Sequence, residues 1–257
     1  MLWRPFIYKL TIVPAALFLA CALWTAWVIF YPAEPVMREA TSRYEMKLVF
    51  APLWPFLYKY YVYKPARLVP GQKYPLVVLL HGVSRHMHGG RYILADEIIG
   101  RHPAFVLVPI APQGTIWAYP GIPAQKTAAV IVRDAIEDVT AANPVDRARI
   151  YISGYSMGGV GTFGMIVTYP DLFAAGMPLC GNWKPEDAAS FPADVPILAL
   201  HGSLDRPELS RNMVATLQQA GRPALYIEYP GVGHNVWDYA YTDPAIWDWL
   251  FAQQRRR

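Results

Sequence analysis

The sequence predicts an α/β fold with a mostly parallel, doubly wound sheet, helices on both faces, and one N-terminal transmembrane helix ahead of it. Three observations support this prediction. Short runs of Val, Ile and Leu alternate with helical stretches, which is typical of parallel strands joined by crossover helices. A Gly-x-Ser-x-Gly sequence directly follows one such run, as at a sharp strand-to-helix turn. A charge-free apolar stretch near the start of the chain is long enough to cross a bilayer.

The apolar stretch runs from Leu10 to Tyr31, with Arg4 and Lys9 before it. The apolar region of a secretory signal is only about 7 to 15 residues long and precedes a small-residue cleavage site, which is not evident here. We therefore expect residues 1–31 to be an uncleaved signal-anchor, with a cleaved, secreted form as the alternative. The preceding cations favour a cytoplasmic N-terminus and an exported, periplasmic or extracytoplasmic domain, although two arginines beyond the span weaken that bias.

Residues 32–55 are rich in proline and aromatic residues and show no clear period, so we expect a juxtamembrane connector there. Residues 56–257 are then one catalytic domain, long enough to bury a full core. The expected elements, in chain order, are strands at 58–63, 75–80, 105–108, 150–153, 197–200 and 226–229, and helices over 127–141 and 212–220.

The net charge of +4 owes much to three C-terminal arginines, and no basic patch interleaved with aromatic residues suggests a nucleic-acid partner. Cys180 is the only cysteine beyond the apolar span, which excludes a disulfide within the catalytic domain.

The strand at 150–153 runs into Gly154-Tyr155-Ser156-Met157-Gly158. A turn this tight brings backbones so close that only glycine fits two positions before and after the serine, and the serine hydroxyl is left above the sheet edge. Ser156 is therefore the candidate nucleophile, although the bare motif also arises by chance.

Two further residues follow in the order that such a nucleophile requires. Asp205 lies just past the strand at 197–200, and His234 lies in a glycine-rich loop after the strand at 226–229. A serine hydroxyl attacks a carbonyl only when a neutral imidazole removes its proton, and a carboxylate orients that imidazole. We expect His234 as base and Asp205 as acid. The alternative is that the three are an N-cap serine, a solvated loop aspartate and a core histidine.

An acyl-transfer site also needs donors for the negative oxygen of the tetrahedral intermediate. The backbone amide of Met157 follows the nucleophile at a helix N-terminus, where the helix dipole favours negative charge. The second donor is expected after the apolar strand at 75–80, from the amide of Val83, with Ser84 as the alternative.

Several segments in order resemble the α/β-hydrolases of the bacterial esterase and predicted-peptidase group related to dienelactone hydrolase and polyhydroxybutyrate depolymerase. The resemblance runs from about Tyr58 to Gln253 and rests on Tyr74–Gly82, Ala111–Gln113, Val145–Tyr151 with the serine turn, Tyr169–Ala175, Cys180–Gly181, His201–Asp205 and Gly231–Asn235. It implies the α/β-hydrolase fold, a cofactor-independent hydrolase, and the roles given above for Ser156, Asp205 and His234.

The chain departs from this family in two places. Asp205 is followed by Arg206-Pro207, where the family commonly continues with a valine and proline turn. The loop after Gly82 is often glycine-rich and acidic in the family, whereas here it contains an arginine and two histidines. The first departure lies directly beside the expected acid, and the second suggests a different substrate preference.

Aromatic residues after strand ends are candidates for the pocket rim, because loops at the carboxyl ends of strands build the pocket. These candidates are Trp117, Tyr119, Trp183 and Trp237, and they would suit an apolar or aromatic acyl group. Ordinary packing is the alternative for each. His86 and His88 lack a third ligand, so no metal site is expected, and His81 is interpreted as bracing its loop.

The sequence therefore favours a serine hydrolase that acts on small-molecule carboxylic esters through an acyl-enzyme. A serine peptidase of the same fold and a catalytically silent binding module remain alternatives.

Overall fold

The computed structural model describes residues 42–50, 57–112 and 114–255. The predicted signal-anchor, residues 1–31, and much of the predicted connector lie outside these ranges. Among the described residues, no helix has the length and apolar character needed to cross a membrane.

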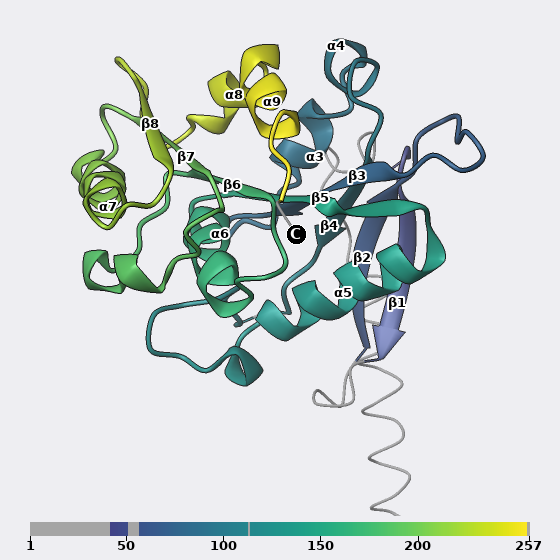
Figure 1. Ribbon diagram of the computed structural model, residues 1–257, viewed down its shortest axis with the longest axis horizontal. Helices are drawn as coiled ribbons and strands as arrows, with labels where there is room; N and C mark the ends of the chain where they lie inside the picture. Colours follow the sequence, from purple (N-terminus) through teal and green to yellow (C-terminus); the bar gives the residue numbers. More distant parts are fainter. Residues whose placement is uncertain (1–41, 51–56, 113, 256–257) are drawn as a thin grey trace, which may run out of the picture.

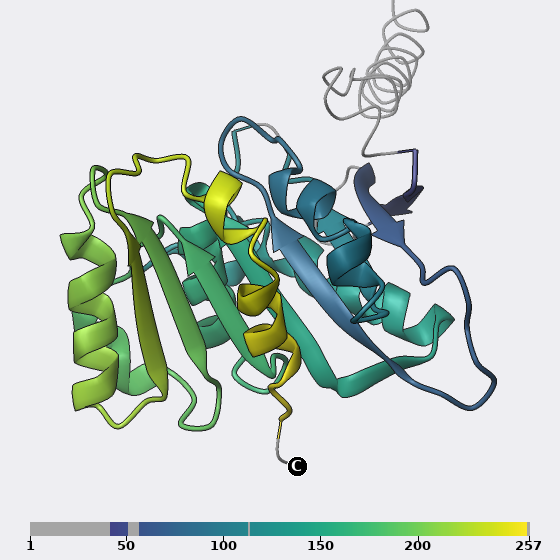
Figure 2. The same cartoon turned by 90° about the horizontal axis from the view of Figure 1, so that it is seen from above.

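Eight strands of the described chain form one sheet in the order β1-β2-β4-β3-β5-β6-β7-β8 (Figure 1). Strands β1 and β2 run antiparallel to their neighbours, and β3 to β8 are parallel, which confirms the mostly parallel sheet. Viewed from above in Figure 2, the strands lie side by side from the purple N-terminal end to the yellow-green C-terminal end. Their bounds are β1 Glu45–Phe50, β2 Leu57–Tyr63, β3 Tyr74–Leu80, β4 Phe105–Pro109, β5 Val145–Tyr155, β6 Ala175–Leu179, β7 Ile197–Gly202 and β8 Ala224–Tyr229.

The sheet begins earlier than predicted from the sequence, because β1 lies within the residues expected to be a connector. It pairs antiparallel with β2, from Glu45 opposite Val62 to Phe50 opposite Leu57. As an edge strand it leaves Met46 and Leu48 exposed. Its sequence therefore lacks the continuous apolar run by which the central strands were recognised.

Helices cover both faces of the sheet, as predicted (Figure 1). One face carries α5 (Ala129–Ala142), α6 (Met157–Thr168) and α7 (Glu208–Gln219), with the short 3-10 turns η1 (Ala124–Lys126) and η2 (Pro185–Ser190) nearby. The other face carries α3 (His88–Tyr92), α4 (Asp96–Ile99), α8 (Trp237–Ala240) and α9 (Pro244–Phe251).

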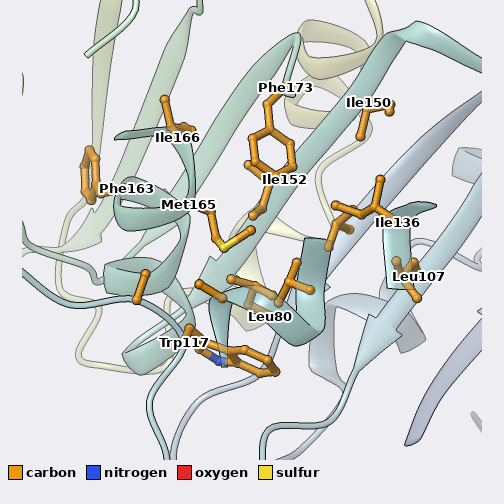
Figure 3. Close-up of a cluster of buried hydrophobic side chains, with 14 of the residues drawn as sticks. Leu80, Leu107, Trp117, Ile136, Ile150, Ile152, Phe163, Met165, Ile166 and Phe173 are labelled. Atoms are coloured by element: carbon orange, nitrogen blue, oxygen red, sulfur yellow. The ribbon is translucent and has the colours of Figure 1, made fainter. Parts of the chain in front are cut away.

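The two faces enclose two hydrophobic cores, and the central strands supply both. Along β3, Leu76, Val78 and Leu80 belong to the core under α5 to α7, whereas Val77 and Leu79 belong to the opposite core. Successive side chains of a strand point to opposite faces, so a strand buried on both sides needs an unbroken apolar run. Figure 3 shows part of the first core, where Leu80 and Ile152 lie near Met165 of α6.

The parallel strands β3, β5, β7 and β8 all end at the same edge of the sheet. In open α/β sheets the carboxyl ends of the strands form the crevice where ligands bind. The loops that follow these four strands carry the residues predicted to act in catalysis.

Candidate active site

Ser156 forms the junction between β5, which ends at Tyr155, and α6, which begins at Met157. Its backbone has φ 56° and ψ −119°, a conformation that a non-glycine residue adopts only when the surrounding structure enforces it. The Ser156 amide donates a 2.9 Å hydrogen bond to the carbonyl of Leu179 on β6, which holds the strained turn in place. The sequence prediction of a sharp strand-to-helix turn is confirmed.

The glycines on either side of Ser156 are required by close backbone contact. A Cβ on Gly158 would collide with the carbonyl oxygen of Leu80 at the end of β3, and a Cβ on Gly154 would collide with the carbonyl of Gly158. Helix α6 therefore lies directly against the strand ends, and its N-terminus points at the serine turn.

The structure brings Ser156, His234 and Asp205 together, although their loops are far apart in the sequence. Nε2 of His234 lies 2.9 Å from Oγ of Ser156, and Nδ1 lies 2.6 Å from Oδ2 of Asp205. A carboxylate can only accept, so Nδ1 carries the proton and donates a hydrogen bond to Asp205. Nε2 is then free to accept the serine proton.

The acid loop and the histidine loop hold each other in place. The amide of Leu204 donates to the carbonyl of Val232 at 2.9 Å, and the amide of Gly231 donates to Oγ of Ser203 at 2.8 Å. The relative position of Asp205 and His234 is thus fixed by the backbone as well as by their own hydrogen bond.

A second histidine, which was not predicted from the sequence, contacts the same carboxylate. His201, at the end of β7, is 2% exposed, and its Nε2 lies 3.2 Å from Oδ2 and 2.5 Å from the carbonyl oxygen of Asp205. Its Nδ1 lies 2.7 Å from Oγ of Ser210, which in turn donates to the carbonyl of Gly181 at 2.6 Å. The four-residue spacing from His201 to Asp205 was the available signal.

These neighbours keep Asp205 ionised. Partial burial by itself would raise the pKa of Asp205, but the hydrogen bond from His234 and the electrostatic interactions with His234 and His201 lower it overall. A lowered pKa maintains the negative charge that orients the imidazole.

Cys180 lies beside this cluster, and its Sγ is 3.4 Å from the carbonyl oxygen of His234. Ligand atoms of Cys180, Asp205 and His234 lie within 4.8 Å of one another, close enough to hold a metal ion. However, burial and the nearby Asp205 raise the pKa of the thiol to about 12, and metals bind the thiolate. A metal ion here would also displace the hydrogen bond between Asp205 and His234, so the donor set fits a hydrogen-bonded triad better.

A cavity of about 330 Å³ opens above Ser156. Val83 and Met157 both line it, and neither of their amides donates a backbone hydrogen bond within the described part of the chain. Both amides are therefore available as donors for a ligand. The other residues that line the cavity are Ile116, Ala118, Tyr119, Val160, Cys180, Asn182, His201, Asp205, Arg206, Leu209 and His234.

The four aromatic residues predicted at the rim have different positions. Tyr119 lines the cavity and is 50% exposed. Trp117 is fully buried instead, and its indole N–H donates to the carbonyl of His81 at 2.8 Å. Trp183 packs against Gly164 of α6, away from the cavity. The prediction for Trp117 and Trp183 is thus corrected, because their rings fill the core beneath the site.

Trp237 does not line the cavity but lies against the imidazole of His234, with ring centroids 5.6 Å apart and planes at 87°. On its other side Trp237 stacks with His88 at 5.3 Å. The rings of His86 and His88 lie edge to face at 5.4 Å. His88 therefore packs behind the candidate catalytic histidine.

His81 braces its loop, as predicted from the sequence. Its Nδ1 lies 2.7 Å from the carbonyl of Gly82, and its Nε2 accepts the amide proton of Ala111 at 3.1 Å. The ring thereby connects the loop after β3 to the loop after β4.

The strand order, the serine turn and the contact between Ser156, His234 and Asp205 together define an α/β-hydrolase with the geometry of a serine hydrolase. Comparison with known proteins gives the same class. A solved structure described as a thermostable esterase superposes with a TM-score of 0.78 at 28% identity, covering 84% of this chain and 64% of that one.

Curated relatives extend this comparison. The chain is 32% identical over 111 residues to a probable carboxylesterase (SOBER1-like) of Arabidopsis thaliana, a match that covers 40% of this chain and 42% of the relative. It is 29% identical over 115 residues to poly(3-hydroxyalkanoate) depolymerase C of Paucimonas lemoignei, covering 42% of this chain and 28% of that protein.

The chain thus spans less than half the length of either curated relative. No family model matches it. The fold and these relatives place the chain in the α/β-hydrolase superfamily, among proteins named as esterases.

Proposed function

We propose that this protein hydrolyses small-molecule carboxylic esters through an acyl-enzyme intermediate, without a cofactor. The observation that carries the proposal is the contact of Ser156 Oγ with His234 Nε2 at 2.9 Å, while Nδ1 of the same ring contacts Asp205 at 2.6 Å. The relatives named as esterases support the same chemistry.

In this mechanism Ser156 attacks the ester carbonyl as its proton passes to Nε2 of His234. Asp205 stabilises the imidazolium that forms, and the amides of Val83 and Met157 bind the negative carbonyl oxygen. The imidazolium then protonates the leaving alcohol, which leaves an acyl group on Ser156. Water attacks this acyl-enzyme, with His234 acting as base again, and releases the carboxylic acid and free Ser156.

A Ser156→Ala variant tests the proposal. Loss of the nucleophile is expected to lower kcat for short 4-nitrophenyl esters by at least about a thousandfold. The parent is also expected to bind a fluorophosphonate probe covalently, and the variant is not. Ser190→Ala serves as the control, because Ser190 is exposed at the end of η2 and does not line the cavity. Equal turnover by Ser156→Ala and the parent would contradict the mechanism. An unlabelled, inactive parent would instead favour the silent binding module.

We further propose that residues 1–31 anchor the protein in a membrane, with the catalytic domain on the exported side. The charge-free composition of Leu10 to Tyr31 and the cations before it support this proposal. The full chain should resist extraction from membranes by alkaline carbonate, and a reporter fused at its C-terminus should be active only outside the cytoplasm. Release of the protein by carbonate, or a reporter active inside, would contradict it.

A further inference from the structure

Arg206 lies in the wall of the cavity that contains Ser156, directly after Asp205. Among the described residues that line the cavity, it is the only lysine or arginine. Much of the remaining wall is apolar, contributed by Val83, Ile116, Ala118, Met157, Val160 and Leu209. Arg206 is exposed to solvent, so an ion pair formed there with an anion would have the strength typical of a protein surface.

The Arg206 guanidinium has no hydrogen bond or ion pair within residues 42–50, 57–112 and 114–255. Most other arginines there pair with a carboxylate, namely Arg101, Arg133, Arg147, Arg149, Arg211 and Arg255. The adjacent carboxylate, Asp205, is already shared between His234 and His201. Arg206 is thus a charged group at the site whose counter-ion the described chain does not supply.

The backbone of Arg206 is strained at this position. Its φ is 45°, a value at which glycine or asparagine is favoured. It also precedes Pro207, and a residue before proline prefers an extended conformation. The carbonyl of Arg206 accepts the amide proton of Leu209 at 3.2 Å, which ties this turn to the start of α7. A residue this ill-suited to its backbone is a reason to look for a role of its side chain.

We propose that Arg206 binds a negatively charged group of the substrate, so that the preferred substrates are esters carrying a carboxylate within reach of this side chain. A guanidinium binds a carboxylate through two parallel hydrogen bonds, which would fix the substrate relative to Ser156. This inference rests on the proposed ester hydrolysis and specifies its substrate class. The carboxylate can belong to the acyl group or to the alcohol, and the test distinguishes the two.

The test compares kcat/KM for matched pairs of esters. The acyl arm uses mono(4-nitrophenyl) adipate against 4-nitrophenyl hexanoate, which differ only in the terminal carboxylate. The alcohol arm uses 4-acetoxybenzoate against its methyl ester. For each pair, the ratio of the charged to the neutral ester is measured in the parent, in Arg206→Gln and in Arg206→Lys. Arg67→Gln is the control, because Arg67 is exposed, lies in the loop between β2 and β3, and does not line the cavity.

In at least one arm, Arg206→Gln is expected to lower the charged-to-neutral ratio about fivefold, the size of a solvent-exposed ion pair. Arg206→Lys should keep part of the preference, and Arg67→Gln should keep all of it. Added salt should lower the ratio in the parent but not in Arg206→Gln, because it screens the pair.

Three results would overturn the inference: an equal ratio in the parent and Arg206→Gln in both arms, an equal drop in Arg67→Gln, or a ratio in the parent that does not respond to salt. A failure of ester hydrolysis itself has a different signature. The parent would then hydrolyse neither ester of either pair, and both proposals would fall together.

Discussion

At the residue scale, the carboxylate of Asp205 is contacted by two imidazoles. His234 approaches from the loop after β8, and His201 approaches from β7 within the protein. His201 is fixed in turn by its contact with Ser210 on α7, whose hydroxyl donates to the carbonyl of Gly181. A rotation of Asp205 would break contacts on both sides, so this chain of hydrogen bonds positions the acid for His234.

Replacing His201 tests this positioning role. His201→Gln should lower kcat for 4-nitrophenyl esters about tenfold to a hundredfold with little change in KM, because a charge-assisted hydrogen bond to the acid is weakened. The matched control is His102→Gln, since His102 contacts Asp248 on α9 and neither residue lines the cavity. A kcat of His201→Gln within twofold of the parent would show that His201 does not position Asp205.

A second prediction at the residue scale concerns how stability depends on pH, because the hydrogen bonds of His81 require its neutral ring. Nε2 accepts from the Ala111 amide, and protonation would remove that acceptor. Burial lowers the pKa of His81 to about 4, so in acid the unfolded chain takes up a proton that the folded protein does not. The stabilising effect of neutral His81 is thus complete above pH about 6.5, and it is lost as the pH falls towards 4.

Over this pH interval, His81 should account for a loss of about 3 kcal/mol in the free energy of unfolding. Denaturant unfolding of the parent and of His81→Gln at several pH values measures the contribution. The variant should have a flatter pH dependence, because glutamine does not titrate. Parallel curves for the two proteins would contradict the assignment.

At the scale of the element, α6 is a poor helix by composition that is stabilised by its contacts. Its first half contains Gly158, Gly159 and Gly161, and each glycine costs a helix about 1 kcal/mol relative to alanine. This cost is offset because the glycines let α6 pack closely against β3, β5 and β6, where a side chain would not fit. This close packing directs the Met157 amide and the helix dipole towards the position of the negative oxygen of the tetrahedral intermediate.

Gly158→Ala should therefore be severe, because its Cβ would collide with the Leu80 carbonyl and push α6 away from the strand ends. We expect a fall in kcat of about a hundredfold or more, the cost of losing an oxyanion donor, together with a lower Tm. Gly233→Ala is the control, since the nearest atom to its Cβ lies at 3.9 Å. If Gly158→Ala kept the activity and Tm of the control, close packing of α6 against the strands would not be required for activity or stability.

On the scale of the whole molecule, β1 completes an edge of the sheet and connects it to α3. It pairs along all of β2, and just before it the hydroxyl of Tyr44 donates to the carbonyl of Gly90 at 2.7 Å. The side chain of Arg43 donates to the carbonyl of Leu94 at 2.6 Å. The folded unit therefore includes residues on the N-terminal side of the predicted boundary at 56.

Two truncations test the extent of this unit. A chain of residues 42–257 should remain folded and bind the fluorophosphonate probe. A chain of residues 57–257 should have a lower Tm and aggregate more, because β2 becomes an open edge. Thermal unfolding and size-exclusion chromatography compare them. Equal Tm values and equal monomer fractions would show that β1 is dispensable.

The sequence alone predicted every strand of the sheet except β1 and β6, and it predicted the order of the candidate catalytic residues. Strands β3, β4 and β7 were predictable because burial on both faces demands continuous apolar runs. The serine turn was predictable because its glycines are a local requirement of the backbone. Edge strand β1 and strand β6, which contains glycine and proline, carry no such run, and β1 was assigned to the connector.

Only the tertiary structure decided which side chains meet. Trp117 and Trp183 follow strand ends like true rim residues, but the direction of each ring depends on the space left by α6. His201 contacts Asp205 because β7 and α7 converge there, and Arg206 lies in the cavity wall because of a backbone conformation that its sequence disfavours. Periodicity and motifs report local constraints, whereas these contacts depend on how distant segments pack, which the local sequence does not encode.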